Sequence, residues 1–160
     1  MFNGPAPDIQ IFDNKEDEIE AVAGWLSERS EEGIRAHEIG VIVRSSAELD
    51  RAESAAQAAD LPHKILDHTV EPTSGKLSIG TMHLAKGLEF KAVVVMAVDD
   101  EVVPLQARIE SIAYESDLQE VYDTERHLLY VACTRARDNL LVTSGDTPSE
   151  FLDDLRSQAR

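Results

Sequence analysis

Cysteine is almost absent from this chain. Among 160 residues it occurs once, as Cys133, so no disulfide can form within the chain. A single thiol fits the reducing cytosol, where disulfides are rare, and we therefore expect a cytoplasmic protein. Cys133 lies in a helical pattern of apolar residues, which predicts an unreactive side chain in the core.

Long hydrophobic runs are also missing. No apolar segment approaches the roughly 20 residues that a membrane-spanning helix needs. The first seven residues lack the basic region and the apolar stretch of a secretory signal. We expect no membrane partner. The chain is 42% hydrophobic and 29% charged, and its length suits one globular domain with a proper core.

Basic residues are scarce. The chain has 15 Lys and Arg against 31 Asp and Glu, which gives a net charge of −16. Non-specific binding of nucleic acid depends on cations that neutralise phosphates. The composition therefore argues against a broad nucleic-acid surface, but it leaves room for a narrow contact.

A phosphate-binding loop of the G-x-x-x-x-G-K-[ST] type is absent. Gly75-Lys76 has Val70 in place of the first glycine, and it is followed by Leu77 instead of Ser or Thr. The five histidines show no metal-ligand spacing with the cysteine, so the sequence predicts no metal site.

The chain is organised around residues 77–97, LSIGTMHLAKGLEFKAVVVMA. This stretch predicts a strand, a polar turn with a short helix, and a second strand over 91–98. The apolar, β-branched character of the second strand indicates burial on both faces, as in a parallel sheet. Four polar residues lie between the strands, where strand ends meet loops: Thr81, His83, Lys86 and Glu89. In open α/β sheets, ligands bind at the carboxyl ends of strands.

Strands and helices alternate along the rest of the chain. Further strands are predicted at 8–12, 39–43, 61–66 and 139–143, and a loop at 68–75. Helices are predicted after Asn14, after Ser45 to about residue 59, over 118–132, and from Thr147 to the end of the chain. Residues 108–117 are ambiguous. This alternation predicts an α/β fold with a mostly parallel sheet and flanking helices.

Three helix starts carry capping signals. Asn14 precedes an acidic first turn, and Gly33 is a plausible stop for that helix. Ser45 with Glu48 forms a capping-box pattern. Residues 147–150, TPSE, combine a cap, a proline at the first helical position and a capping-box Glu.

Three segments make a family resemblance visible. Residues 81–90, TMHLAKGLEF, closely resemble motif V of the superfamily 1 DNA helicases of the UvrD/Rep/PcrA type. Residues 125–136, ERHLLYVACTRA, resemble motif VI, and residues 39–46, IGVIVRSS, resemble motif IV. The three motifs occur in the family's order and the resemblance extends over about residues 9–142. It implies the C-terminal, second RecA-like domain over residues 8–160, with residues 1–7 as a linker or the edge of a fragment.

The resemblance implies two arginines at the γ-phosphate of ATP. Arg135 matches the arginine of motif VI that reaches across the domain cleft, and Arg44 matches the arginine of motif IV. The guanidinium suits phosphate because its fork is planar and always charged. The structural alternatives are a surface salt bridge for Arg135 and a pairing of Arg44 with a carboxylate such as Glu48.

The resemblance also implies the remaining contacts. Glu89 would bind ribose hydroxyls, and Lys86 with Gly87 would lie near the phosphates. Thr81 and His83 would hold the backbone of single-stranded DNA. The alternatives are a surface pair between Lys86 and Glu89 and an isolated core or surface histidine at His83.

Two features depart from the family's pattern. Many members have an aromatic residue that stacks on adenine just before the motif IV arginine, whereas this chain has Val43. Members of this type also carry a large accessory domain between motifs IV and V, where this chain has a short connection, so we expect a trimmed or small variant.

The implied cofactor is ATP with Mg²⁺, and only in a complete enzyme. The phosphate loop and the Mg²⁺-binding carboxylates would come from the N-terminal RecA-like domain, in the same native chain or in a partner. The chain alone is not expected to hydrolyse ATP. A stand-alone, non-catalytic interaction module derived from such a domain is the main alternative. An unrelated α/β phosphate-binding enzyme is a third, but no nucleophile–base pair or glycine-rich loop supports it.

Overall fold

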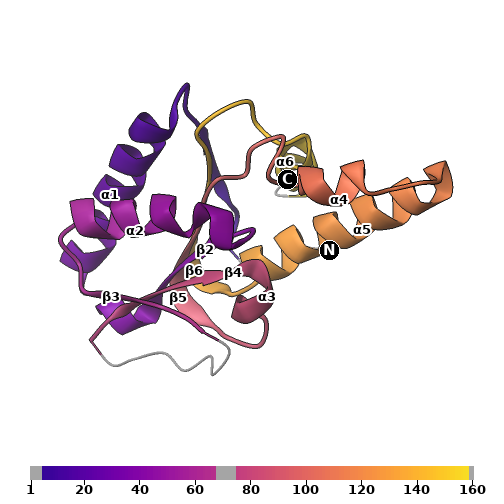
Figure 1. Cartoon of the computed structure of the whole chain (residues 1–160). Helices are drawn as coiled ribbons and strands as arrows, with labels where there is room; N and C mark the ends of the chain where they lie inside the picture. The colour runs from indigo at the N-terminus through magenta and orange to yellow at the C-terminus, as the bar shows by residue number, and fades with distance from the viewer. Residues whose placement is uncertain (1–4, 68–74, 159–160) are drawn as a thin grey trace.

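The structure, a computed structural model, describes residues 5–67 and 75–158. Six strands form one sheet in the order β1-β6-β5-β2-β4-β3, and all neighbouring strands are parallel (Figure 1). The strands are β1 (Asp8–Ile11), β2 (Ile39–Val43), β3 (His63–Ile65), β4 (Leu77–Thr81), β5 (Phe90–Val95) and β6 (Ala136–Ser144). The predicted α/β class and parallel sheet are confirmed.

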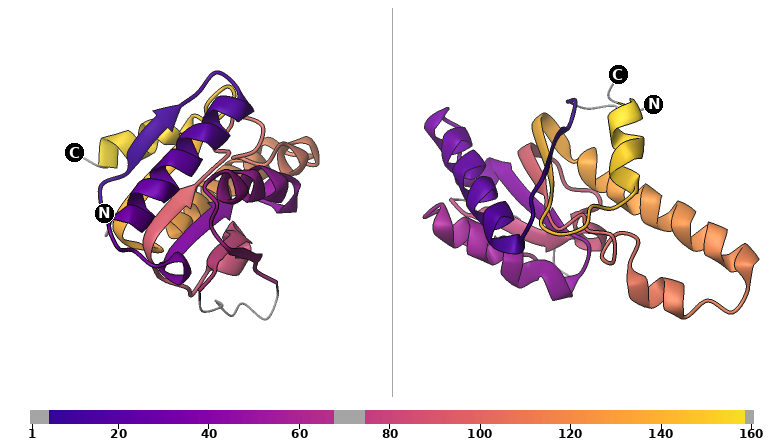
Figure 2. Two further views of the ribbon diagram at one scale, coloured as in Figure 1. Left: turned by 90° about the vertical axis from the view of Figure 1, so that its left-hand side faces the viewer. Right: turned by 90° about the horizontal axis from the view of Figure 1, so that it is seen from above.

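Helices cover both faces of the sheet (Figure 2). They are α1 (Lys15–Glu31), α2 (Leu49–Ala58), α3 (Met82–Ala85), α4 (Gln106–Glu110), α5 (Glu115–Cys133) and α6 (Phe151–Gln158), with short 3-10 turns at η1 (Ala36–Glu38) and η2 (Ser46–Glu48). One core cluster joins α1 and α2 to the sheet, and the other joins α3, α5 and α6 to its opposite face. None of the described helices is long and apolar enough to cross a membrane.

The central strands are buried on both faces. Every residue of β2 is buried, and successive residues of β5 alternate between the clusters, with Val93 and Val95 in one and Val94 in the other. This explains why β2 and β5 read as continuous apolar runs. Cys133 lies in the same interior and is fully buried, as predicted.

The first helix begins and ends as its sequence predicts. The side-chain oxygen of Asn14 accepts a hydrogen bond from the backbone N–H of Asp17 at 2.8 Å, which satisfies one free donor of the first turn. Gly33, just past the last helical residue, has a φ of +97°, a conformation that glycine adopts without strain.

The capping box predicted at Ser45 is wrong. The Ser45 side chain makes no capping bond, a 3-10 turn intervenes, and α2 begins at Leu49. The Glu48 carboxylate, which a capping box would turn back toward Ser45, instead forms an ion pair at 3.1 Å with Arg51, three residues further along the chain.

The helix start predicted at Thr147 is also wrong, because α6 begins at Phe151. Pro148 forms an antiparallel bridge with Asp99, which keeps this segment extended. The hydroxyl of Ser149 then accepts a hydrogen bond from the Phe151 N–H at 3.2 Å.

Three further segments differ from expectation in extent or were left open. The strand predicted over 61–66 is shorter, His63–Ile65. The ambiguous segment 108–117 contains the end of α4 and the start of α5, which extend together beyond the sheet (Figure 1). The predicted loop at 68–75 lies, apart from Gly75, outside the described residues.

Candidate nucleotide and DNA site

Both predicted DNA-binding residues lie where β4 ends. Thr81 is the last residue of β4 and pairs in register with Val43 at the end of β2. His83 follows in the first turn of α3. Thr81 is half-buried and His83 is exposed. The core alternative for His83 therefore does not apply, and its side chain is accessible to a ligand.

The chain returns from α3 to the amino end of β5 through the loop that carries Lys86, Gly87 and Glu89. Gly87 has a φ of +90°, which permits the turn. All three residues are exposed, and no ion pair joins Lys86 to Glu89 in the described part of the chain. The surface-pair alternative is therefore not what the structure shows. The Phe90 N–H then donates to the Arg135 carbonyl at 2.8 Å, which fixes the loop beside Arg135.

Arg135 follows the last turn of α5, and its guanidinium bonds only to neutral acceptors within the described residues. Its Nε donates to the Val131 carbonyl at 3.1 Å, its Nη1 to the Leu88 carbonyl at 3.1 Å, and its Nη2 to the Thr134 hydroxyl at 3.2 Å. The side chain is half-buried. The alternative of a surface salt bridge is not seen among the described residues, where no carboxylate neutralises the charge of Arg135.

Arg44 is bonded in a different way. It is 4% exposed and forms a bidentate pair with Glu125, with Nε–Oε1 and Nη2–Oε2 distances of 2.9 and 2.7 Å. The alternative of a carboxylate partner is confirmed in kind, but the partner is Glu125 of α5 instead of Glu48. Val43, just before Arg44, is fully buried and has no surface on which a base could stack.

The two arginines come from opposite ends of the strands, yet both bond to α5. Arg44 follows the carboxyl end of β2 and reaches Glu125, whereas Arg135 precedes the amino end of β6 and reaches Val131. Six residues separate Glu125 from Val131, which is roughly 9 Å of helix rise. Both arginine side chains therefore bond to α5, but at positions about two turns of the helix apart.

Glu125 was not predicted from the sequence as a site residue. It is fully buried, and burial alone would raise its pKa. Hydrogen bonds from Arg44, the Leu105 N–H and Arg108 outweigh burial, so the pKa of Glu125 is lowered. A signal was available: Glu125 lies four residues before Leu129, on the inward stripe of α5, where a carboxylate without a partner would be costly.

A second charged network lies at the carboxyl edge of the sheet. Arg51 Nη1 contacts Glu18 Oε1 at 3.0 Å and Asp99 Oδ2 at 2.9 Å, and all three side chains are buried. Burial opposes the charge of Arg51, but Asp99 and Glu18 outweigh it and raise its pKa. Glu18 also accepts from the N–H of Ala97, whose φ is +59°.

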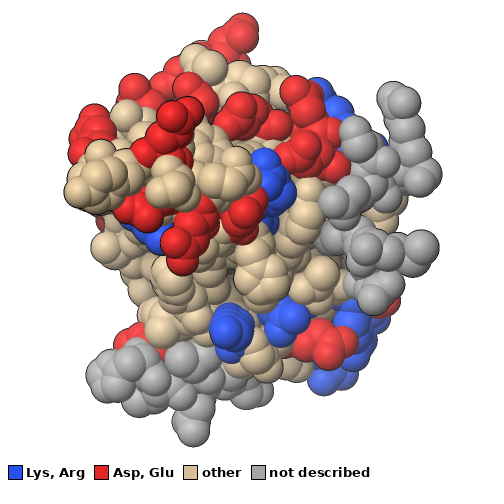
Figure 3. All heavy atoms as spheres, turned by 90° about the vertical axis from the view of Figure 1, so that its right-hand side faces the viewer, with Lys and Arg blue, Asp and Glu red and all other residues tan. Residues whose placement is uncertain are grey.

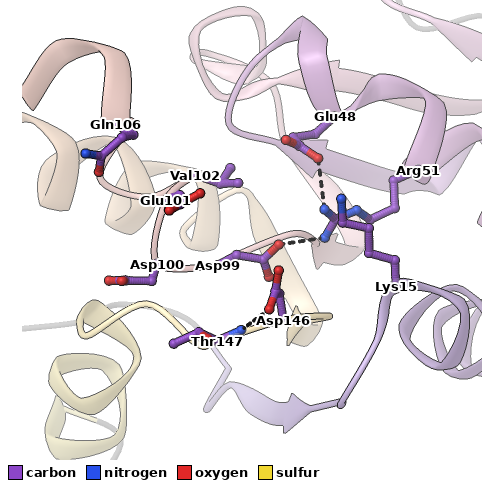
Figure 4. A pocket seen from close by; sticks show the side chains of 10 residues that line it. All are labelled: Lys15, Glu48, Arg51, Asp99, Asp100, Glu101, Val102, Gln106, Asp146 and Thr147. Carbon is purple, nitrogen blue, oxygen red and sulfur yellow. Dashed lines mark hydrogen bonds and ion pairs between the residues drawn. The ribbon is translucent and has the colours of Figure 1, made fainter. Parts of the chain in front are cut away.

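This network forms one wall of a cavity of about 430 Å³ (Figure 4). The cavity is lined by Lys15, Glu48, Arg51, Asp99, Asp100, Glu101, Val102, Gln106, Asp146 and Thr147. No group of three or more His, Cys, Asp or Glu side chains in the described residues is arranged to hold a metal ion.

Charge is unevenly distributed over the surface. On the face at which α4 and α5 extend, acidic side chains dominate the upper part and basic side chains gather in the lower part (Figure 3). Lys91 and Arg137 lie near the amino ends of β5 and β6, and the register pair Phe90–Ala136 places these two strand ends side by side next to Arg135. The net charge of −16 therefore does not describe every part of the surface.

Comparison with known proteins points to one family. Residues 67–147 match the model of the UvrD-like helicase C-terminal domain. The chain is 30% identical over 139 residues to the ATP-dependent DNA helicase UvrD1 of Mycobacterium leprae, covering 84% of this chain and 17% of that protein. It is 37% identical over 88 residues to the ATP-dependent DNA helicase PcrA of Bacillus subtilis, covering 54% of this chain and 11% of that protein.

A probable DNA helicase II homolog of Rickettsia conorii is 30% identical over 133 residues, which cover 81% of this chain and 19% of that protein. The chain thus spans about a fifth of the length of such relatives. Among solved structures, the C-terminal domain of a possible DNA helicase from Lactobacillus plantarum WCFS1 has the same fold, with a TM-score of 0.68 and 22% identity over 98% of this chain and 84% of that chain. The motifs, the parallel sheet and the family match agree, and the chain belongs to the UvrD-like helicase C-terminal domain family.

Proposed function

We propose that the chain is the C-terminal motor domain of an ATP-dependent DNA helicase and that Arg135 is its arginine finger. The domain would extend over residues 8–160, with residues 1–7 as a linker. The observation that carries the proposal is the guanidinium of Arg135, held by three neutral acceptors beside the Gly87–Glu89 loop. A half-buried cation without a carboxylate partner is suited to an incoming phosphate.

ATP would be held jointly with a second domain. Arg135 and Lys86 would meet the phosphates, Gly87 would let the backbone approach them, and Glu89 would accept hydrogen bonds from the ribose. ATP supplies the terminal phosphoryl group that is transferred to water. Mg²⁺ would be held by the other domain, as the family resemblance implies. Arg44 would be a further phosphate contact once it leaves Glu125.

DNA would be held at the end of β4. The Thr81 hydroxyl and the exposed His83 ring can bond to phosphate oxygens of a single strand without a large positive surface. Closure of the two domains around ATP would move Thr81 and His83 along the DNA strand, and hydrolysis would reopen the domains. The register pair Val43–Thr81 joins β2, which precedes Arg44, to β4, which ends at the proposed DNA contact Thr81.

The proposal is tested in the native protein that contains this chain. Arg135→Ala is expected to lower the kcat of DNA-stimulated ATP hydrolysis by about 10³-fold or more, which is the scale of other arginine fingers, with nucleotide binding retained. Arg135→Lys keeps the charge but loses the planar fork, so its kcat should lie between those of the parent protein and Arg135→Ala. Arg137→Ala is the control, because it removes an exposed arginine two residues away.

A stand-alone interaction module makes the opposite prediction. Such a module needs no guanidinium directed at phosphate, so binding to its partner would survive Arg135→Ala. Hydrolysis that stays within a few-fold of the parent protein after Arg135→Ala would show that Arg135 is not the finger.

A further inference from the structure

Two arginines and one backbone amide meet at a single buried carboxylate in the middle of α5. Glu125 Oε1 accepts bonds from Arg44 Nε at 2.9 Å and from the Leu105 N–H at 2.7 Å. Glu125 Oε2 accepts bonds from Arg44 Nη2 at 2.7 Å and from Arg108 Nη1 at 2.8 Å. One carboxylate therefore serves two cations from distant parts of the chain.

The two cations differ in exposure. The side chain of Arg44 is 4% exposed and that of Arg108 is 37% exposed, over a carboxylate that is fully buried. A buried carboxylate that loses its only cation is heavily penalised. Glu125 avoids this penalty if Arg44 leaves, because Arg108 and the Leu105 N–H still hold it.

We propose that Glu125 is a positioning residue that keeps Arg44 withdrawn from the terminal phosphate of the nucleotide, and that Arg108 allows Glu125 to release it. The proposal rests on the proposed function, since Arg44 needs an anion to move to. A guanidinium fork fits a carboxylate and a phosphate equally well, so Arg44 exchanges one bidentate partner for another. With Arg44 bound, the pKa of Glu125 is lowered, and when Arg44 leaves, the Arg108 guanidinium and the Leu105 N–H still favour the carboxylate.

The arrangement also connects the two arginines. Arg135 bonds to the Val131 carbonyl, on the helix that carries Glu125. When Arg44 is withdrawn, the end of β2 is tied to α5. When Arg44 binds phosphate, that tie is broken and α5 keeps its contact with Arg108. Nucleotide binding would thereby change which parts of the domain are connected, at the same helix that positions the finger.

The test measures the affinity of the native protein for a fluorescent ATP analogue. Only the fraction of molecules with Arg44 free binds tightly, so apparent affinity follows that fraction. Glu125→Gln weakens the hold on Arg44 and is expected to lower Kd by roughly three- to tenfold. Arg108→Ala leaves Arg44 as the only cation on Glu125 and should raise Kd by about tenfold, with Arg108→Lys restoring it in part.

A purely structural role of Glu125 would give different results. Both substitutions remove contacts, so loss of stability alone changes Kd in one direction only, and thermal unfolding of each variant records that loss. Arg126→Ala is the matched control, because Arg126 is next to Glu125 in α5 and pairs with the surface residues Asp123 and Asp154. Its Kd for nucleotide is expected to stay unchanged.

Double variants decide whether Arg44 is the mediator. In an Arg44→Ala background, neither Glu125→Gln nor Arg108→Ala should change nucleotide affinity further. Shifts of the same sign, no shifts, or shifts that persist without Arg44 would overturn the proposal. A change in affinity for single-stranded DNA instead of nucleotide would assign Arg44 to a DNA phosphate and also overturn it.

Failure of this proposal is distinguishable from failure of the proposed function. A protein that binds and hydrolyses ATP, loses hydrolysis in Arg135→Ala and is indifferent to Glu125→Gln and Arg108→Ala refutes only the role of Glu125. A parent protein that binds no nucleotide refutes both.

Discussion

Replacing Arg51 by methionine is expected to destabilise the domain severely. Arg51 is 7% exposed and is the cation shared by Glu18, Asp99 and Glu48, at distances of 3.0, 2.9 and 3.1 Å. Methionine preserves most of the volume but leaves two buried carboxylates without their cation. Removing one partner of a buried ion pair typically costs about 3–5 kcal/mol. For a domain of this size the loss lowers Tm by roughly 9–15 °C.

The measurement is urea and thermal unfolding of the 160-residue chain, followed by circular dichroism. Arg51→Lys keeps the charge and should lose less than Arg51→Met. Arg156→Met is the matched control, because its ion pair with Asp153 is exposed on both sides and contributes at most about 0.5 kcal/mol. A loss below about 1 kcal/mol for Arg51→Met would refute the reasoning, since it would mean that the two carboxylates do not depend on this cation.

Three further predictions follow from single residues. The cations around Glu125 lower its pKa below the unfolded-state value of about 4.3, so the ionised carboxylate stabilises the fold above that pH and loses this effect on acidification. The difference in unfolding free energy between the parent chain and Glu125→Gln should therefore shrink below about pH 4. A difference that grows below about pH 4 would contradict this reasoning. Burial raises the pKa of Cys133 to about 12, so a thiol reagent should modify it only in denaturant, not within minutes in the folded chain at pH 8. A Cβ on Gly40 would lie 2.7 Å from the Phe90 ring, so Gly40→Ala should cost about 1–3 kcal/mol in urea unfolding, whereas Gly24→Ala, with open space in α1, should be stabilising by about 0.5–1 kcal/mol.

The parts of the fold that the sequence predicts well carry a local sequence signal. The run 39–43 coincides with β2, because a strand buried on both faces reads as continuous apolar residues. Asn14 caps α1 as predicted, because a cap bonds to the next turn of its own helix. In both cases the signal lies within a few residues of sequence, although β4 and β5, which pair with β2, are distant in the chain.

The wrong predictions arose where another partner overrode a local capping pattern. Glu48 pairs with the buried Arg51 instead of completing a capping box. Pro148 is held extended by its bridge to Asp99 instead of opening a helix. Arg51 is only three residues from Glu48, but the distant Glu18 and Asp99 hold it in place. Asp99 is also far from Pro148 in the sequence, so neither capping pattern reveals these long-range contacts.

The candidate site also contains residues with a local sequence signal and contacts that depend on distant partners. His83 and Glu89 are exposed, and their roles in binding stay predictions. The pairing of Arg44 with Glu125 spans 81 residues of sequence, and nothing near Arg44 indicates it. The hydrogen-bond partners of Arg135 could not be predicted from the sequence either, because two of them are backbone carbonyls, which every residue has.

The most direct test of the central claim is a crystal structure of the native protein with a non-hydrolysable ATP analogue and single-stranded DNA. The account predicts that a guanidinium nitrogen of Arg135 lies within hydrogen-bond distance, about 3 Å, of a terminal phosphate oxygen. It also predicts DNA phosphates at Thr81 and His83. An Arg135 side chain still bonded only to the Val131 and Leu88 carbonyls, with the phosphate beyond its reach, would contradict the assignment of the finger.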